Sequence, residues 1–152
     1  MKTRGFEVVS EYAHKGINIP VRKTAYSAGY DIEAAEDITI PVYKNGVKPT
    51  LVKTGLKAYF NSNEALLLLN RSSGPKKGII MANSVGLIDS DYYNNPDNEG
   101  HIMFNFFNCS DEELVIKKGD RIGQAVFINY LTTDDDNASG LRTGGFGSTD
   151  KV

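Results

Sequence analysis

The stretch Ala65-Leu66-Leu67-Leu68-Leu69-Asn70-Arg71-Ser72-Ser73-Gly74-Pro75 decides the fold class. By periodicity alone, its five consecutive apolar residues fit either a helix or a buried strand. The run is short, however, and a polar turn that contains glycine and proline follows it directly. Buried strands are short and end at such turns, whereas most helices are longer, so the sequence predicts a buried strand here.

Short strand-like segments continue on both sides of this run. They combine β-branched and aromatic residues with polar ones, and turn residues separate them at short intervals. The chain has no long amphipathic helical pattern, and only one helical turn is expected, within residues 76–82. This pattern is typical of an all-β sandwich or barrel. The expected strands cover residues 6–10, 37–40, 51–60, 65–69, 101–107, 114–116 and 125–128.

Length and composition restrict the possible functions. The 152 residues suit one domain, and a formal charge of -2 argues against a protein that grips long nucleic acid through its phosphates. Cys109 is the only cysteine and no apolar run is long enough for a signal or a membrane span, so a cytoplasmic protein is expected. With this one cysteine and two histidines, a zinc site is not expected, and His14 and His101 are predicted to be ordinary surface or strand residues.

The last part of the chain differs from the rest. From Thr132 onward there is almost nothing to bury in a core, so the sequence predicts a β domain over residues 1–131 and a flexible C-terminal arm over residues 132–152. A disordered tail would have much the same composition. The segment Gly144-Gly145-Phe146-Gly147-Ser148-Thr149, with Arg142 before it, favours an arm that orders over a phosphate-bearing ligand.

The turn that closes the apolar run offers hydrogen-bond donors without bulk. Arg71, Ser72, Ser73 and Gly74 can surround a phosphate with guanidinium, hydroxyl and backbone N–H groups. A polar surface loop would have the same composition, and the spacing is not that of a Walker loop.

A second polar segment covers residues 83–92. If it is extended, Asp89 and Asp91 lie on one face, where a carboxylate can act as a general base. Tyr92 beside them offers a flat, rigid surface for a sugar. Ser-Asp-Tyr at the end of a strand is also a common turn.

Two further segments carry weaker signals. In residues 28–32, Asp31 begins a strand, where it can either hold a magnesium-bound water or cap a turn. Residues 119–125 present alternating polar side chains, including Gln124, and also fit a salt-bridged β-turn.

Together and in this order, the segments resemble the five motifs of the trimeric dUTPase family. The resemblance spans nearly the whole chain, and its third and fifth motifs are the most specific. It implies a β jelly roll that forms a homotrimer with active sites shared between subunits. It also implies Mg²⁺-dependent hydrolysis of dUTP to dUMP and pyrophosphate. The motifs stand here as A-G-Y-D-I (28–32), R-S-S-G-P-K-K-G (71–78), N-S-V-G-L-I-D-S-D-Y (83–92), G-D-R-I-G-Q (119–124) and R-T-G-G-F-G-S-T (142–149).

The resemblance implies a role for each matching residue. Asp89 is expected to orient or deprotonate the water that attacks the α-phosphorus, and Asp31 to hold Mg²⁺ through a water. Tyr92 is expected to lie under the deoxyribose, and Phe146 to stack on uracil when the arm closes. The expected uracil contacts are Asn83 and the backbone of Gly86, Leu87 and Ile88. The expected phosphate contacts are Arg71, Ser72, Ser73, Gly74, Gln124, Arg142, Gly147, Ser148 and Thr149.

The chain departs from the common family pattern in three places. Tyr92 is separated from Gly100 by the seven residues 93–99 where the common pattern has one, so this loop is six residues longer (seven minus one). It is expected to be a surface turn, and its length resembles that of members from Gram-positive bacteria and their phages. Arg142 stands one residue closer to the glycine pair than in the commonest motif, and Asp150 replaces a frequent glycine.

Two alternatives to a dUTPase remain. A dCTP deaminase would share the fold and an arginine-serine-serine motif, but it needs a glutamate base near the pyrimidine and a different second motif. A nucleotide-responsive regulatory protein would bind a partner through the exposed loop 93–99.

Overall fold

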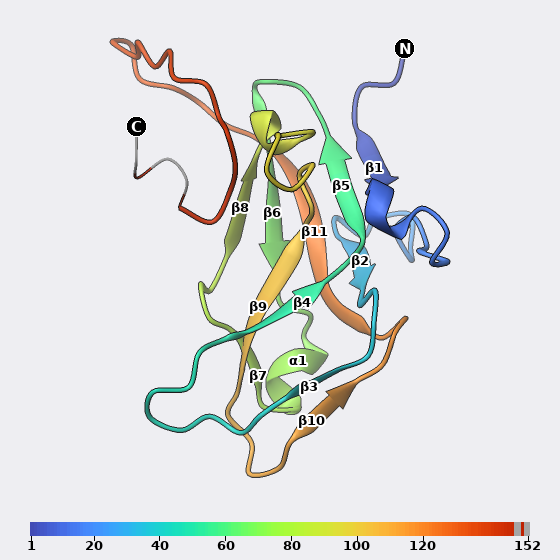
Figure 1. Ribbon diagram of the computed structural model, residues 1–152. Coiled ribbons are helices and arrows are strands. Elements are labelled where there is room, and N and C mark those ends of the chain that lie inside the picture. Colours follow the sequence, from blue (N-terminus) through green and yellow to red (C-terminus); the bar gives the residue numbers. More distant parts are fainter. Residues whose placement is uncertain (148–149, 151–152) are drawn as a thin grey trace.

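The computed structural model describes residues 1–147 and 150. Within them the regular secondary structure consists almost wholly of short strands joined by turns and loops, which confirms the predicted all-β class (Figure 1). No helix in this part of the chain is long and apolar enough to cross a membrane. The strands are β1 (Gly5–Val8), β2 (Tyr30–Glu33), β3 (Ile38–Ile40), β4 (Thr50–Lys53), β5 (Leu56–Tyr59), β6 (Glu64–Leu69), β7 (Ile79–Met81), β8 (Gly86–Asp89), β9 (Met103–Asn108), β10 (Leu114–Ile116) and β11 (Arg121–Asn129). The helical turns are η1 (Ser10–Tyr12), α1 (Ser73–Lys76) and η2 (Ser90–Tyr92).

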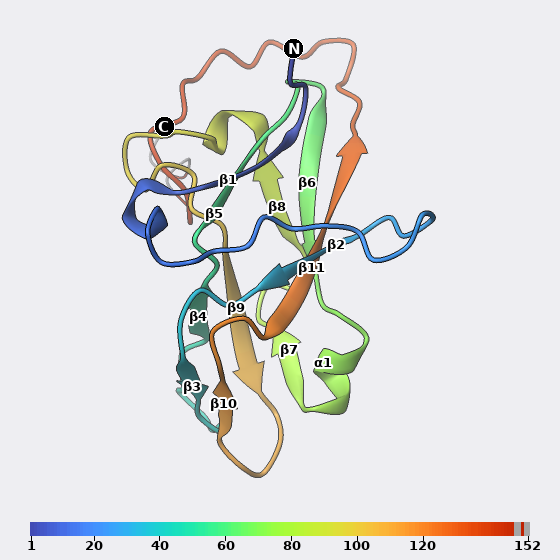
Figure 2. The ribbon, with the colours of Figure 1, turned by 90° about the vertical axis from the view of Figure 1, so that its right-hand side faces the viewer.

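A four-stranded antiparallel sheet in the order β2-β11-β6-β8 forms the frame of the molecule (Figures 1 and 2). The predicted buried strand at residues 65–69 is its β6, which pairs with β11 on one edge and with β8 on the other. Along β8, Asp89 lies opposite Ala65, and Gly86 lies opposite Leu68. The register therefore places Asp89 beside the start of β6, whereas Arg71 follows its end.

The core lies between this sheet and the smaller sheets β4-β9-β7, β1-β5 and β10-β3. Alternation of burial along β9 shows why the segment is a strand, since Phe104 and Phe106 are buried while Met103, Asn105 and Phe107 are only half-buried. The fully buried side chains stabilise the fold through removal of apolar surface from water. The largest are Tyr12, Phe104, Phe106, Ile32, Ile40, Leu56, Leu66 and Ile102.

Two expected elements are wrong in their extent. Residues 51–60 form two strands, because the buried Thr54 hydroxyl donates to the Ile102 carbonyl at 2.6 Å and Gly55 adopts a left-handed φ of 71°. The helical turn lies at Ser73–Lys76 rather than within residues 76–82, because Gly78, with a φ of 80°, ends it ahead of β7.

The C-terminal segment begins where β11 ends, at Asn129. Residues 130–147 form no helix or strand. In Figures 1 and 2 it crosses one end of the sheet and returns beside β8, while α1 lies at the other end. This path brings residues of the predicted arm to the hairpin strand that carries Asp89.

Candidate active site

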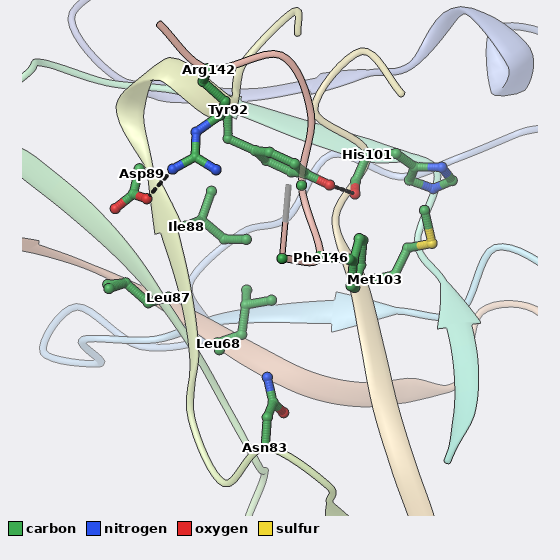
Figure 3. Close-up of a pocket in the computed structure, with 13 residues that line it drawn as sticks. Leu68, Asn83, Leu87, Ile88, Asp89, Tyr92, His101, Met103, Arg142 and Phe146 are labelled. Carbon is green, nitrogen blue, oxygen red and sulfur yellow. Dashed lines mark hydrogen bonds and ion pairs between the residues drawn. The ribbon is translucent and has the colours of Figure 1, made fainter. Parts of the chain in front are cut away.

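A cleft of about 290 Å³ lies between β8, η2 and the C-terminal arm. Figure 3 shows side chains from these elements turned toward it. It brings together the predicted hairpin, carboxylate, sugar-floor and arm residues. The lining residues are Leu68, Asn83, Gly86, Leu87, Ile88, Asp89, Tyr92, His101, Met103, Arg142, Gly145, Phe146 and Gly147.

The hairpin wall of the cleft is fixed by backbone geometry. Ser84 has a φ of 57°, and the Val85 N–H donates to the Asn83 carbonyl at 2.6 Å, which makes the turn before β8 tight. Gly86 allows β8 to lie close to β6, because a Cβ there would stand only 3.0 Å from the Leu68 Cβ. The exposed side chain of Asn83 therefore stands on a tight turn between β7 and β8.

Arg142 links the carboxylates of Asp89 and Asp91, which do not lie on one extended strand. β8 ends at Asp89 and the 3₁₀ turn η2 follows at once, so the expected extended alternation of Asp89 and Asp91 is wrong. Arg142 nevertheless pairs with both. Its Nη2 contacts Asp89 Oδ2 (Figure 3), and its Nε lies 2.6 Å from Asp91 Oδ1. Both carboxylates remain about half exposed, at 49% and 56% of their side chains, and so stay open to solvent and ligand.

Tyr92 forms a closed end of the cleft. It is 5% exposed, and its hydroxyl donates to the His101 carbonyl at 2.8 Å (Figure 3). Burial is the main cause that raises the pKa of Tyr92 above its usual value, so the phenol stays protonated and keeps this hydrogen bond.

The arm approaches the hairpin through its glycine pair. A Cβ on Gly145 would lie 2.5 Å from Tyr92 Cε2, and one on Gly144 would lie 3.2 Å from the Asp97 side chain. Phe146 follows at the mouth of the cleft, 64% exposed and with a φ of 52°, a backbone region that is uncommon for a bulky residue. Gly147 also lines the cleft, whereas Ser148 and Thr149, two predicted phosphate contacts, lie outside the described residues.

The remaining predicted phosphate residues form a second polar cluster around Asp31. Its Oδ1 accepts a 3.0 Å hydrogen bond from Arg71 Nε, and its Oδ2 lies 3.4 Å from Arg121 Nη1. Arg71 also donates to the Ser73 hydroxyl at 3.3 Å, at the start of α1. Exposed Ser72 and half-buried Gly74 belong to the same turn. Gln124 joins it through a 3.0 Å hydrogen bond to the Asn70 carbonyl.

The two groups of residues lie at opposite ends of β6. Six residues separate Ala65, the partner of Asp89, from Arg71. At ~3.3 Å per residue in a strand, this amounts to roughly 20 Å. A single subunit therefore keeps the carboxylates of the cleft apart from the arginines and serines of the second cluster.

The second cluster offers a carboxylate that suits a magnesium ion and arginines that suit the phosphates bound with it. Among the described residues no three acidic, histidine or cysteine side chains gather as a protein-only metal site. Mg²⁺ keeps several waters and often uses one carboxylate plus substrate phosphates, so it needs no such group. Asp31, half-buried between two arginines that can themselves bind phosphate, fits this kind of site.

Two features of the cleft were not predicted. His101, expected at the surface or in a strand, is 4% exposed, and burial is the main cause that lowers its pKa. Its Nε2 accepts the Gly55 N–H at 2.8 Å, which requires a neutral ring. The inserted loop, expected as a surface turn, has its Asn95 side chain buried and bonded to the loop's own backbone. The Gly-His at 100–101 and the repeated asparagines were the available signals, but neither indicates burial.

Comparison with known proteins agrees with this geometry. A family profile described as dUTPase matches residues 15–150. The chain is 55% identical over 152 residues to the deoxyuridine 5'-triphosphate nucleotidohydrolase of Lactococcus lactis subsp. lactis (strain IL1403), a match that covers 98% of this chain and 99% of that protein. Among solved structures, the dUTPase from Streptococcus mutans superposes with a TM-score of 0.79 at 44% identity, covering 86% of this chain and 98% of that chain. A mutant dUTPase from phage phi11 of S. aureus, described with a structural Mg(II) ion, shares the fold with a TM-score of 0.69 at 20% identity over 91% of this chain and 98% of that chain. The chain belongs to the dUTPase family.

Proposed function

We propose that this chain hydrolyses dUTP to dUMP and pyrophosphate, by attack of water on the α-phosphorus. The observation that carries the proposal is the cleft in which Asp89, Tyr92 and the hairpin strand β8 face the arm residues Arg142 and Phe146. It combines an exposed carboxylate, a flat buried ring and a strand with a rigid backbone. In the cytoplasm this reaction limits the uracil available for DNA and supplies dUMP for dTTP synthesis.

Asp89 is the proposed base for the attacking water. Its carboxylate stands at the end of β8 and is about half exposed, so a water can reach it. Arg142 pairs with Asp89 and Asp91, and a triphosphate would offer the guanidinium a competing anion. Exchange of the arginine from carboxylate to phosphate would leave Asp89 unpaired for the water.

The hairpin is the proposed reader of the base, and Tyr92 of the sugar. Asn83 and the β8 backbone from Gly86 to Ile88 are proposed to bond uracil, and Phe146 is proposed to cover its face. Distinguishing dUTP from dTTP means rejecting one methyl group, which affinity alone discriminates by only about 1–3 kcal/mol. A strand that Gly86 seats tightly against Leu68 gives the rigid surface that steric rejection needs.

The second cluster is proposed to hold the triphosphate. Arg71, Ser72, Ser73, Gly74 and Gln124 would supply its donors, and Asp31 would hold a magnesium ion through a water. When bound, the ion would neutralise charge that develops on the phosphate oxygens. Gly147, Ser148 and Thr149 of the arm are the remaining proposed phosphate contacts.

The active site is proposed to be shared between subunits of a homotrimer. Asp89 and Arg71 lie at opposite ends of β6, roughly 20 Å apart along a strand that rises ~3.3 Å per residue. A nucleotide would have to span this distance to use both residues of one chain, which favours a trimer in which a second copy brings its cluster to the cleft of the first. Light scattering should give three times the 16.7 kDa mass of one chain; a monomer with full activity would overturn the shared site.

Pyrophosphate release with Mg²⁺ tests the proposed reaction. Initial rates with dUTP, dTTP, dCTP and UTP at equal concentration should show turnover of dUTP alone. Asp89→Asn should bind dUTP but lose most turnover, because only the base is removed. Retained turnover in Asp89→Asn would overturn the assignment of the base.

Neither alternative function gains support. The relatives are dUTPases, and a dCTP deaminase would release ammonia rather than pyrophosphate from dCTP, which a separate ammonia assay would detect. The inserted loop is bonded to the body through Glu99 to Lys57 and Tyr93 to Glu7, and no contact of the described residues indicates a partner for its exposed residues.

A further inference from the structure

The inserted loop, residues 93–99, reaches the functional end of Tyr92. Asn98 Nδ2 donates a 2.8 Å hydrogen bond to the Tyr92 hydroxyl, which in turn donates to the His101 carbonyl at 2.8 Å. The phenol oxygen thus has one donor and one acceptor in fixed places. The ring is held at its far end as well as at its backbone.

The orientation of the Asn98 amide is itself determined. Its Oδ1 accepts from Asn95 Nδ2 at 2.8 Å and from the Gly100 N–H at 3.1 Å. Both partners are donors, so the oxygen must face them and the amino group must face the phenol. Asn98 therefore donates to Tyr92 and cannot exchange this role by rotating its amide.

The loop that carries Asn98 is anchored at its centre and at its end. The Asn95 amide, 5% exposed, bonds the Tyr92 carbonyl at 2.7 Å and accepts the Asn98 N–H at 3.1 Å. Glu99 adopts a left-handed φ of 63°, a strained position that persists only when its surroundings fix it. Lys57 at 2.6 Å and the Ser10 N–H at 3.0 Å both bond its carboxylate.

We propose that Asn98 is a positioning residue that locks the Tyr92 ring and thereby sharpens the rejection of ribonucleotides. The inference rests on the proposed function, in which Tyr92 lies under the sugar. Asn98 does not line the cleft and acts only through the tyrosine. On this proposal the six additional residues of the loop position Tyr92, a role that a loop without contact to the tyrosine would not have.

Rigidity is what such a filter needs. A site that merely fits deoxyribose discriminates weakly against one added hydroxyl, by about 100-fold where affinity alone acts. Steric repulsion rises steeply with overlap, so a ring that yields by a few tenths of an ångström would accept the ribose 2'-hydroxyl. A phenol bonded on both sides resists that movement, and the arm backbone at Gly145 packs against the same ring.

The test is the ratio of kcat/KM for dUTP to kcat/KM for UTP in four proteins: wild type, Asn98→Ala, Tyr92→Phe and the double variant. Loss of one neutral hydrogen bond should lower the ratio about 3- to 10-fold in Asn98→Ala. Tyr92→Phe should lower it similarly. In the Tyr92→Phe background, Asn98→Ala should change the ratio by less than about twofold, because the shared bond is already gone.

Asn94→Gly is the matched control within the same loop. This substitution removes the 2.7 Å hydrogen bond from Lys57 to Asn94 Oδ1 and leaves both hydrogen bonds of the Tyr92 hydroxyl in place. Glycine readily adopts the φ of 55° found at this position. The dUTP-to-UTP ratio should stay at the wild-type value. If Asn98→Ala lowers the melting temperature too far for assay, Asn98→Ser replaces it in the same comparison.

The outcomes separate this inference from the proposed function. A wild-type protein that does not hydrolyse dUTP overturns the function and the inference together. A wild-type protein that hydrolyses dUTP, with an unchanged ratio in Asn98→Ala or with equal losses in both backgrounds, overturns the role of Asn98 alone.

Discussion

Adding one methyl group to the arm should separate arm docking from folding. In Gly145→Ala the new Cβ would lie 2.5 Å from Tyr92 Cε2, whereas ordinary contact begins at 3.4 Å. Relief needs a shift of about 0.9 Å (3.4 minus 2.5). Because two hydrogen bonds hold the buried tyrosine, the arm must move and carry Phe146 with it. A misplacement of about 1 Å can cost about 100-fold in rate, so kcat/KM for dUTP should fall to that extent.

A graded series of alanines gives the controls. Gly140→Ala changes an exposed glycine of the same arm and should leave kcat/KM unchanged. Gly144→Ala brings its Cβ to 3.2 Å from the exposed Asp97 side chain, which can move, so the loss should stay within about threefold.

Pyrophosphate release at dUTP concentrations below KM measures kcat/KM for each variant. The melting temperature of Gly145→Ala should equal that of the wild type, because the arm lies outside the core. Wild-type kcat/KM in Gly145→Ala, or an equal loss in Gly140→Ala, would refute the packing of the arm backbone on the tyrosine.

Four further predictions concern core packing, the pH dependence of stability, the arm and the metal. Gly123→Ala would place its Cβ in the buried ring of Phe104, and overpacking of a core should lower the free energy of unfolding by about 1–3 kcal/mol, measured by urea denaturation. Burial lowers the pKa of His101 in the folded state, so the unfolded chain binds a proton first as the pH falls. The free energy of unfolding should therefore decrease as the pH drops below 6.5. In His101→Gln the amide oxygen can still accept the Gly55 N–H, so urea titrations at pH 5.5 and 7.5 should show a weaker pH dependence than in the wild type. Truncation before Arg142 should abolish pyrophosphate release and change the melting temperature by only a few degrees. Removal of Mg²⁺ with EDTA should also abolish pyrophosphate release, and added Mg²⁺ should restore it. A large drop in melting temperature in either experiment would show that the arm or the metal is needed for folding.

The sequence predicted a strand correctly where both the length of the apolar run and the turn residues after it indicated one. The five apolar residues 65–69 are too few for a typical helix and are closed by Gly74-Pro75, so β6 was predicted correctly. Residues 51–60 have the same strand-like composition throughout, and their division at Gly55 depends on a tertiary bond from Thr54. Local composition carries no information on such a bond.

The grouping of the predicted site residues within one chain could not be read from the sequence. The order of strands around β6 puts Asp89 and Arg71 at opposite ends, and strand order is set by tertiary packing. The asparagines at 95 and 98 look the same in sequence whether they face solvent or bond within the loop. Burial of Asn95 decides between the two, and only coordinates show it.

The separation of the two residue groups along β6 has a genetic consequence. On the proposed arrangement, a subunit with Asp89→Asn still lends its intact arginine cluster, and a subunit with Arg71→Ala still lends its intact carboxylate. Each variant alone is inactive. In randomly mixed trimers, however, about a quarter of the sites (one half times one half) combine an intact Asp89 from one subunit with an intact Arg71 cluster from another. Two defective alleles in one cell would therefore complement each other, and a single defective allele would disable sites built partly from the normal gene.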